Sequence, residues 1–247
     1  MSYCVALKLN HGLVFMSDTL TNGGVDNISR YPKTFCWGVD GERQIILTTA
    51  GNLATSQAVV SILSEQTKVR DKRAPSILEA PTMFQVARIV SQTLADVITS
   101  SSRGQQQAES TFSSTFILGG QIKGGEMRLY LIYPEGNFIE VSEEQPFFQI
   151  GETKYGRPIL VRAFEQKMNF EDAVKLLMVS FDSTIKANLS VGLPLDLNIY
   201  EVDSFLSTTS RRITSENSYF QMISQKWGAS LKESLYALPT YSLNDDA

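Results

Sequence analysis

Histidine is nearly absent from this sequence, because His11 is the only one among 247 residues. A metal site built from several histidines is therefore excluded, and no Cys-x-x-Cys motif supplies thiolate ligands instead. Any Ser-His-Asp or Cys-His catalytic site would have to use His11, yet Asn10-His11-Gly12 has the composition of a turn. If the chain is an enzyme, we expect a base other than histidine, with no cofactor and no metal.

Charge of one sign and long apolar runs are also missing. The formal net charge is −4 and no basic stripe stands out, which argues against nucleic acid or an anionic membrane as the main partner. No apolar run approaches the roughly 18 residues of a membrane span, and the first residues do not read as a signal peptide. Cys4 and Cys36 both lie in apolar, strand-like stretches, so we expect two reduced core thiols in a cytoplasmic protein.

The apolar patterning places groups of strands and pairs of helices in turn along the chain. Strands are expected at 3–9, 13–17, 34–38, 44–49, 112–120, 128–133, 137–141, 146–150 and 195–203. Helices are expected at 53–66, after Pro81-Thr82, near Thr153, after an Asn169 cap and at 214–236. Strands grouped in this way favour antiparallel sheets. We therefore expect an α+β fold, a four-layer α/β/β/α sandwich of two antiparallel sheets, with residues 1–247 in a single domain and 100–110 as a loop.

The first two strands form a hairpin that starts almost at the N-terminus. With a two-residue turn at His11-Gly12, Asn10 faces Leu13 and Ser2 faces Thr21. Asp18 then lies about three residues along the ladder from Ser2, or roughly 10 Å away. Because a shift of one residue would turn the side chain to the other face, this count predicts proximity and leaves orientation open.

A serine at a mature N-terminus can act as a nucleophile without histidine. Once Met1 is removed, Ser2 carries a hydroxyl and a free α-amine, whose reference pKa of about 7.7–8.0 leaves a useful neutral fraction near pH 7. An N-terminal amine acting as base toward the hydroxyl of its own residue is an established arrangement.

Three further residues would complete such a site. Lys33 stands at the entry to the second predicted hairpin, and its ammonium would lower the pKa of a nearby amine. Asp18 would keep Lys33 charged and oriented. The backbone N–H of Gly51, just before a predicted helix, is a reasonable oxyanion donor. Each residue also has an ordinary structural interpretation, as a turn residue, a solvated charge or a strand-to-helix glycine, so the pattern alone leaves both open.

Residues 2–18, S-Y-C-V-A-L-K-L-N-H-G-L-V-F-M-S-D, resemble the N-terminus of mature proteasome β-type subunits. Lys33 matches the catalytic lysine of that family, and T-A-G-N-L-A at 49–54 matches its oxyanion-glycine segment. Longer blocks resemble the bacterial Anbu (ancestral β-subunit) branch, at 25–29, 50–60, 117–124, 131–140, 147–160 and 180–194. The resemblance implies an N-terminal-nucleophile hydrolase sandwich with Ser2, Asp18, Lys33 and Gly51 as catalytic residues. It also implies self-assembly into a ring or ring-like helical homo-oligomer.

The chain departs from the family at four positions. Ser2 stands where most active proteasome subunits carry threonine, and Leu20 stands where an arginine is usual. Glu152 occupies the segment that supplies a supporting serine, and Asn188 occupies the segment that supplies a supporting aspartate. The catalytic residues are kept while their supporting residues change, which affects the expected rate and substrate class.

Three functions fit the sequence. The first is a proteasome-type peptidase or amide hydrolase that uses Ser2 as nucleophile. The second is a narrow amidase or amide-transferring enzyme for a small or peptide-like substrate, and the third is a self-assembling subunit without turnover. The sequence identifies neither the natural substrate nor an ATPase partner.

Overall fold

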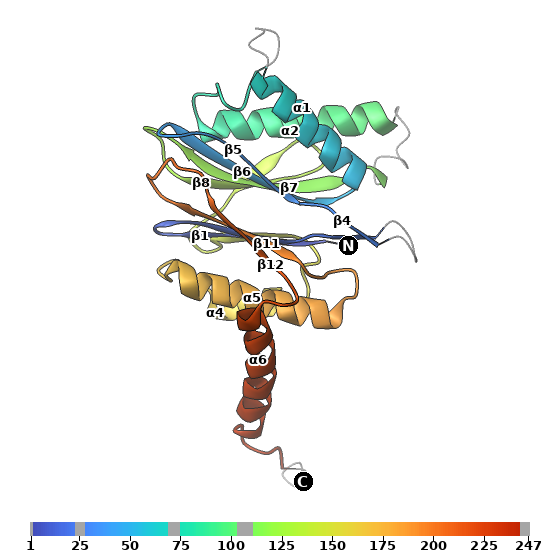
Figure 1. Cartoon of the computed structure of the whole chain (residues 1–247), viewed down its shortest axis with the longest axis vertical. Coiled ribbons are helices and arrows are strands. Elements are labelled where there is room, and N and C mark those ends of the chain that lie inside the picture. Colours follow the sequence, from blue (N-terminus) through green and yellow to red (C-terminus); the bar gives the residue numbers. More distant parts are fainter. Residues whose placement is uncertain (1, 23–27, 69–74, 103–110, 243–247) are drawn as a thin grey trace.

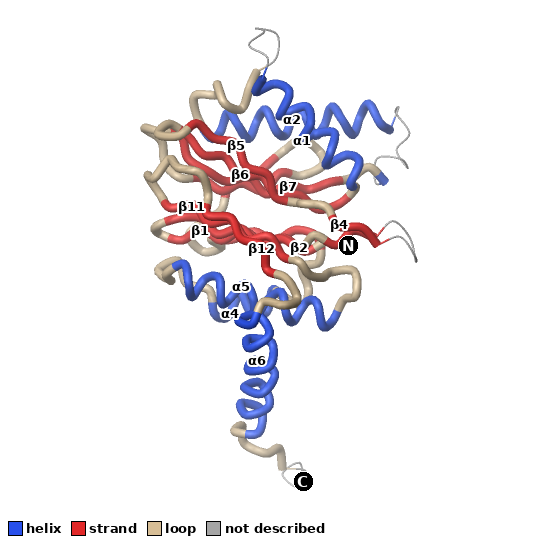
Figure 2. Tube along the Cα trace, viewed as in Figure 1, coloured by secondary structure: helices blue, strands red, loops and turns tan. Residues whose placement is uncertain are grey.

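Two five-stranded antiparallel sheets face each other, and helices cover their outer sides (Figures 1 and 2). The structure is a computed structural model, and it describes residues 2–22, 28–68, 75–102 and 111–242. The first sheet has the order β10-β1-β2-β11-β12, with bounds Phe147–Gly151, Tyr3–Leu9, Gly12–Asp18, Leu195–Glu201 and Thr209–Ile213. The second has the order β5-β6-β7-β8-β9, with bounds Thr34–Val39, Arg43–Gly51, Ser114–Ile122, Arg128–Ile132 and Phe138–Glu140.

Helices form the two outer layers. α1 (Leu53–Lys68) and α2 (Met83–Ser102) cover the second sheet, whereas α4 (Arg157–Ala163) and α5 (Phe170–Ala187) cover the first. α6 (Ser218–Tyr236) begins against α5 and then leaves the body of the molecule (Figure 1). The arrangement confirms the predicted α+β sandwich of two antiparallel sheets in four layers.

Side chains alternate between two cores along the first strand. Tyr3, Val5 and Leu7 belong to the core between the first sheet and its helices. Cys4 and Ala6 belong to the core between the two sheets. All of β1 except Lys8 is thus buried, because the strand lies in the middle of the sandwich between β10 and β2. Tyr3, its first residue, is already fully buried.

The first hairpin turns one residue earlier than the sequence count predicts. Leu9 pairs with Gly12 and Cys4 pairs with Ser17, so the turn is Asn10-His11 and the pairing register shifts by two residues. Only glycine fits at position 12, because a Cβ there would lie 2.5 Å from Phe170 Cζ and would also collide with the Tyr200 carbonyl. A register shift of two residues leaves each side chain on the same face of the sheet. It also places Asp18 two residues closer to Ser2 along the ladder than the count predicts.

Several element boundaries differ from the predictions. α4 begins at Arg157 rather than near Thr153, and α2 continues to Ser102, into the predicted loop at 100–110. Residues 103–110 of that loop lie outside the described part of the chain. Three short strands were not predicted: β3 (Leu20–Asn22), β4 (Ile28–Arg30) and β12. β12 ends at Ile213, and α6 therefore begins four residues later than predicted.

Two predicted core positions are wrong. Cys36 is exposed, because it lies on β5 at the edge of the second sheet, so only Cys4 is a buried thiol. The apolar spacing in 53–66 predicts that Ile62 lies on one face with Val59 and Leu63, but Ile62 has an exposed fraction of 39% and does not share their buried face. The helical spacing of apolar residues also predicts one apolar face on α2 and one on α5, and both faces pack against their sheets.

Candidate active site

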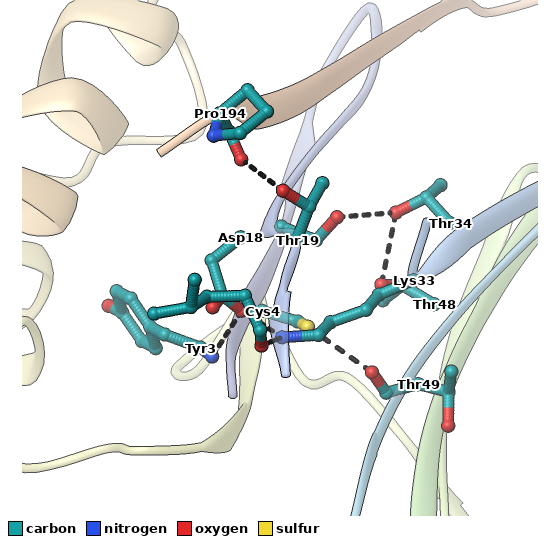
Figure 3. A network of polar contacts seen from close by, with 11 residues as sticks. Tyr3, Cys4, Asp18, Thr19, Lys33, Thr34, Thr48, Thr49 and Pro194 are labelled. Carbon is teal, nitrogen blue, oxygen red and sulfur yellow. Dashed lines mark hydrogen bonds and ion pairs between the residues drawn. The ribbon is translucent and has the colours of Figure 1, made fainter. Parts of the chain in front are cut away.

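A buried ion pair lies beside the start of the first strand. Lys33, just before β5, places its Nζ 2.6 Å from Oδ1 of Asp18 at the end of β2 (Figure 3). Asp18 has an exposed fraction of 0% and Lys33 one of 4%. Lys33 Nζ also donates to the Leu20 carbonyl at 2.7 Å, and the Tyr3 N–H donates to Asp18 Oδ1 at 2.9 Å. The pair is therefore anchored to the residue that follows Ser2.

The protonation of Asp18 is set by opposing influences. Burial raises the pKa of its carboxyl, and the Lys33 ammonium, with the N–H groups of Tyr3 and Gly192, partly offsets that rise. Its second oxygen, Oδ2, is buried and makes no hydrogen bond within the described ranges. Lys33 is thus the main group that holds Asp18 in its charged form.

The backbone of Ser2 is held by the turn that follows β10. The Glu152 N–H donates to the Ser2 carbonyl at 2.6 Å, which extends the pairing of Tyr3 with Gly151 by one residue. Gly151 has φ +83°, and a Cβ there would collide with the Ser2 carbonyl. Because β1 alternates between two cores, Ser2 shares the inter-sheet face of Cys4. Ser2 is half-buried at the end of this face.

The side chain of Tyr3 fixes the same strand from the helix side. Its hydroxyl accepts a hydrogen bond from Gln149 Nε2 at 2.6 Å and shares one with Ser180 Oγ at 2.7 Å. Its ring packs against Phe181 with centroids 4.4 Å apart. Burial raises the pKa of the Tyr3 phenol, which therefore stays protonated. The backbone beside Ser2 is therefore rigidly placed.

Gly51 lies at the end of β6, in a conformation that a side chain could not adopt. Its φ is +123°, and a Cβ would lie 2.5 Å from the Ser113 carbonyl oxygen. The Asn52 N–H donates to the carbonyl of Ser113, just before β7, whereas the Thr49 N–H donates to the carbonyl of Lys33 on the other side of the strand. Since N–H directions alternate along a strand, the Gly51 N–H points to the same side as that of Thr49, away from β7.

The strand that carries Gly51 runs beside the strand that carries Ser2. Cys4 Sγ contacts the Thr49 carbonyl at 3.4 Å. A Cβ placed on Gly151 would lie 3.4 Å from Ala50 Cβ, which is an ordinary contact. Cys4, two residues after the candidate nucleophile, therefore contacts Thr49, two residues before the candidate oxyanion donor, across the space between the sheets. Gly51 thus lies on the strand that faces the strand after Ser2, while Asp18 and Lys33 are tied to Tyr3 next to Ser2.

Two of the departures from the family pattern form one contact. Asn188, at the end of α5, donates from Nδ2 to Glu152 Oε2 at 2.8 Å, and the Lys154 N–H donates to Oε1 at 3.0 Å. Glu152 has an exposed fraction of 5%. Its N–H holds Ser2 while its carboxylate ties the same turn to α5. The sequence marked both positions as unusual but gave no sign that they are partners.

A row of hydroxyl groups beside Lys33 was not predicted. Ser17 Oγ and Thr34 Oγ1 are 3.0 Å apart. Thr34 Oγ1 donates to Thr48 Oγ1 at 3.1 Å (Figure 3). These residues join the two sheets next to the ion pair. The alternation of side chains along β2, β5 and β6 is the only sequence signal for these hydroxyl groups. Using it requires knowing which strands of the two sheets face each other.

The described ranges hold no cluster of three or more His, Cys, Asp or Glu side chains suited to a metal ion. None of their helices combines the length and the apolarity needed to cross a bilayer.

The two facing antiparallel sheets between helical layers, with the chain beginning between them, define the fold of the N-terminal-nucleophile hydrolases. Within this class the chain belongs to the proteasome subunit family, whose sequence model, "Proteasome subunit", matches residues 2–193. The expected family is thereby confirmed.

The solved structures that resemble the chain include several Anbu proteins. Anbu (ancestral beta-subunit) from Yersinia bercovieri is 42% identical, with a TM-score of 0.90, over 98% of this chain and 99% of that one. Anbu from Hyphomicrobium sp. strain MC1 is 44% identical, with a TM-score of 0.89, over 98% and 100%. The helical assembly of the Anbu complex from Pseudomonas aeruginosa is 42% identical, with a TM-score of 0.91, over 99% and 100%. No curated protein matches the chain significantly.

Proposed function

We propose that this chain is a cytoplasmic amide hydrolase of the proteasome type, with Ser2 as its nucleophile after removal of Met1. Its substrate is a peptide or a peptide-like amide. The observation that carries the proposal is the buried Lys33–Asp18 pair, which is hydrogen-bonded to the Tyr3 N–H directly beside Ser2. A buried ion pair is weak evidence for stability alone, so its position at the chain start favours a catalytic role.

The reaction needs one proton carrier, the α-amine of Ser2. The neutral amine takes the proton from Ser2 Oγ as Oγ attacks the carbonyl carbon of the substrate. The carbonyl oxygen becomes an oxyanion, which accepts a hydrogen bond from the Gly51 N–H. The resulting ammonium gives its proton to the leaving nitrogen, the C–N bond breaks, and an ester on Ser2 remains. Water, deprotonated by the same amine, then hydrolyses the ester and restores Ser2.

Lys33 and Asp18 adjust this proton carrier without taking its proton. The Lys33 ammonium disfavours a second positive charge nearby, so it lowers the pKa of the α-amine and enlarges the neutral fraction. Asp18 fixes the position of Lys33, with an Nζ–Oδ1 distance of 2.6 Å. Serine lacks the methyl group that restricts the χ1 rotation of threonine, so Ser2 is less constrained than a threonine would be.

Covalent labelling tests the assignment. The full chain is incubated with a β-lactone or a peptide boronate after intact mass has shown that Met1 is removed. We expect one label on Ser2 of the wild type, none on Ser2→Ala, and labelling again on Ser2→Thr. Labelling of Ser2→Ala at the wild-type rate would refute the nucleophile. Stable retention of Met1 in the native host would refute catalysis and favour the subunit without turnover.

A substrate panel separates the two enzymatic alternatives. Hydrolysis of unfolded proteins and varied peptides supports the peptidase. Turnover of one defined small amide, without activity on peptides, would replace it with the narrow amidase. Both outcomes require the same Ser2 dependence.

We also propose that the chain assembles with copies of itself into a ring or a ring-like helical turn. The structure from Pseudomonas aeruginosa is described as a helical assembly of the Anbu complex, and it spans 99% of this chain at 42% identity. This similarity supports a homo-oligomer as the working form. Sedimentation of the purified chain at micromolar concentration tests it, and a monomer at every concentration would refute it.

A further inference from the structure

Three buried hydroxyl groups meet where the second sheet passes into α1. Thr49 lies on β6, Ser56 in the first turn of α1 and Ser114 at the start of β7. Thr49 Oγ1 lies 2.7 Å from Ser56 Oγ, and Ser56 Oγ lies 3.2 Å from Ser114 Oγ. We call these three side chains the corner cluster. It joins two strands of one sheet to the helix that covers them.

The corner cluster holds the backbone of Asn52, the residue after the candidate oxyanion donor. The Asn52 carbonyl accepts from the Ser114 hydroxyl at 3.0 Å and from the Ser56 hydroxyl at 2.9 Å. The Asn52 N–H donates to the Ser113 carbonyl at 2.9 Å, and Asn52 Oδ1 caps α1 by accepting from the Thr55 N–H at 3.0 Å. Asn52 is therefore tied to β7 and to α1 at the same time.

Gly51 needs this support because it has no side chain of its own to fix its conformation. Its φ is +123°, and without a Cβ its backbone conformation is set by the residues around it. Gly51 pairs with Ser114 across the ladder, and a Cβ on Gly51 would lie 3.1 Å from Ser114 Oγ. The missing side chain of Gly51 thus leaves room for Ser114 Oγ to reach the Asn52 carbonyl.

The side chains on this face of the sheet change from apolar to hydroxyl at the end that carries Gly51. Leu47 on β6 and Phe116 on β7 belong to the core beneath α1 and α2. Two positions nearer to Gly51 along the same faces stand Thr49 and Ser114, since side chains alternate along a strand. Apolar packing alone could bury this corner, whereas a buried and hydrogen-bonded polar network favours a single arrangement of the backbone. The change of side chains therefore favours a role in positioning.

We propose that Ser114, together with Ser56, is a positioning residue that fixes the direction of the Gly51 N–H toward a substrate oxyanion. This inference rests on the proposed function, and it adds a residue that acts through Gly51 without touching the substrate. The Gly51 N–H turns if the backbone on either side of it rotates. Asn52 opposes that rotation on one side through its bonds to Ser114 and Ser56. Thr49 opposes it on the other side through its contact with Ser56. A donor held in place costs no reorganisation when charge develops on the substrate.

Two probes that both label Ser2 separate the oxyanion donor from the nucleophile in the full chain. Opening of a β-lactone by Ser2 Oγ passes through a carbonyl oxyanion, whereas addition of Ser2 Oγ to the double bond of a peptide vinyl sulfone does not. In Ser114→Ala we expect labelling by the lactone to slow by at least about 10-fold, less than the roughly 100-fold to 1,000-fold loss that follows removal of a donor. Labelling by the vinyl sulfone should stay within about twofold of the wild-type rate, because the nucleophile and its base are unchanged.

Two further variants complete the comparison. Ser56→Ala should show the same difference between the probes with a smaller loss, because the Ser56 N–H still donates to the Asn52 carbonyl at 3.0 Å. Alanine favours a helix more than serine does, so a loss in this variant does not come from a weaker helix. Ser91→Ala on α2 is the matched control, since Ser91 is also buried and its hydroxyl donates to the Arg88 carbonyl of its own helix at 3.1 Å. Both probes should label the control at the wild-type rate.

The outcomes separate this inference from the proposal on which it rests. Equal slowing of both probes in Ser114→Ala, or slowing of neither, overturns the positioning role while Ser2 stands as nucleophile. The same difference between the probes in Ser91→Ala also overturns it. A wild type that neither probe labels refutes the proposed function, and hydrogen exchange then tests the support of the corner by itself. The amides of residues 52–56 should exchange at least about 10-fold faster in Ser114→Ala than in Ser91→Ala, and equal exchange would overturn the inference.

Discussion

Lys33 and Asp18 form an ion pair that water does not reach, and the cost of burying them is large. Removing one partner of such a pair typically costs roughly 3–5 kcal/mol, because the other charge is left buried and unpaired. Asp18 shows the balance between desolvation and charge attraction, because burial raises the pKa of its carboxyl and the Lys33 ammonium opposes that rise. An arrangement of this cost beside Ser2 is consistent with a role in chemistry.

Lys33→Met should therefore destabilise the chain in a pH-dependent way. Without the ammonium, the pKa of Asp18 rises further above its unfolded value of about 3.9. A raised carboxyl pKa in the folded state contributes stability at low pH, which is lost as pH rises toward the folded pKa, by about 1.4 kcal/mol per pH unit. The stability deficit of the variant should thus be larger at pH 8 than at pH 5, as measured by urea unfolding. Lys167→Met, which breaks an exposed pair with Glu165, should show no such trend. An equal deficit at both pH values would contradict the coupling.

Gly51→Ala should damage both stability and labelling of Ser2. Alanine at φ +123° is strained, and its Cβ would lie 2.5 Å from the Ser113 oxygen, so the end of β6 must move together with its N–H. We expect a loss of at least about 2 kcal/mol in the free energy of unfolding. Gly41→Ala is the matched control, with φ +75° and no atom within 4 Å of the new Cβ, and it should cost about 1 kcal/mol. Similar losses in both variants would show that the close approach at Gly51 is unimportant.

At the scale of elements, the first hairpin shows both what the sequence reveals and what it conceals. The apolar runs on either side of a turn predicted both strands and the proximity of Asp18 to Ser2, but not the faces of their side chains. The register could not be obtained in this way, because it depends on Gly12, whose missing side chain makes room for Phe170 and for the carbonyl of Tyr200. Those contacts join segments more than 150 positions apart, which local pattern does not encode.

The candidate site likewise contains residues that the sequence predicts and contacts that it does not. Ser2, Asp18, Lys33 and Gly51 could be selected from the sequence because each lies near the end of a predicted strand and together they supply complementary chemistry. The bond between Glu152 and Asn188 could not, since it depends on where α5 ends relative to the turn after β10. β12 was missed because its residues are polar and mostly exposed, so the alternation that reveals a half-buried strand is absent.

At the scale of the whole molecule, the candidate site and the C-terminal helix occupy opposite sides of the first sheet. Ser2 lies on its inter-sheet face, whereas α6 begins against α5 on its helix face. The family sequence model ends at residue 193, so β11, β12 and α6 lie outside its match. Assembly through the helix side of this sheet would leave the space between the sheets uncovered.

Hydrogen exchange should report this organisation directly. In a dissociated chain, the exposed end of α6, from Ala229 to Tyr236, has no packed neighbour to stabilise its helical hydrogen bonds, so its amides should exchange rapidly. If the copies associate through this end of the helix, exchange of residues 229–236 should slow as concentration rises. The amides of α5, whose apolar face is buried within one chain, should exchange at the same rate at every concentration. Ser2→Ala should give the wild-type pattern, because the candidate site lies on the other side of the first sheet. Exchange at the end of α6 that does not depend on concentration, in a sample that sedimentation shows to be assembled, would place the contact between copies elsewhere.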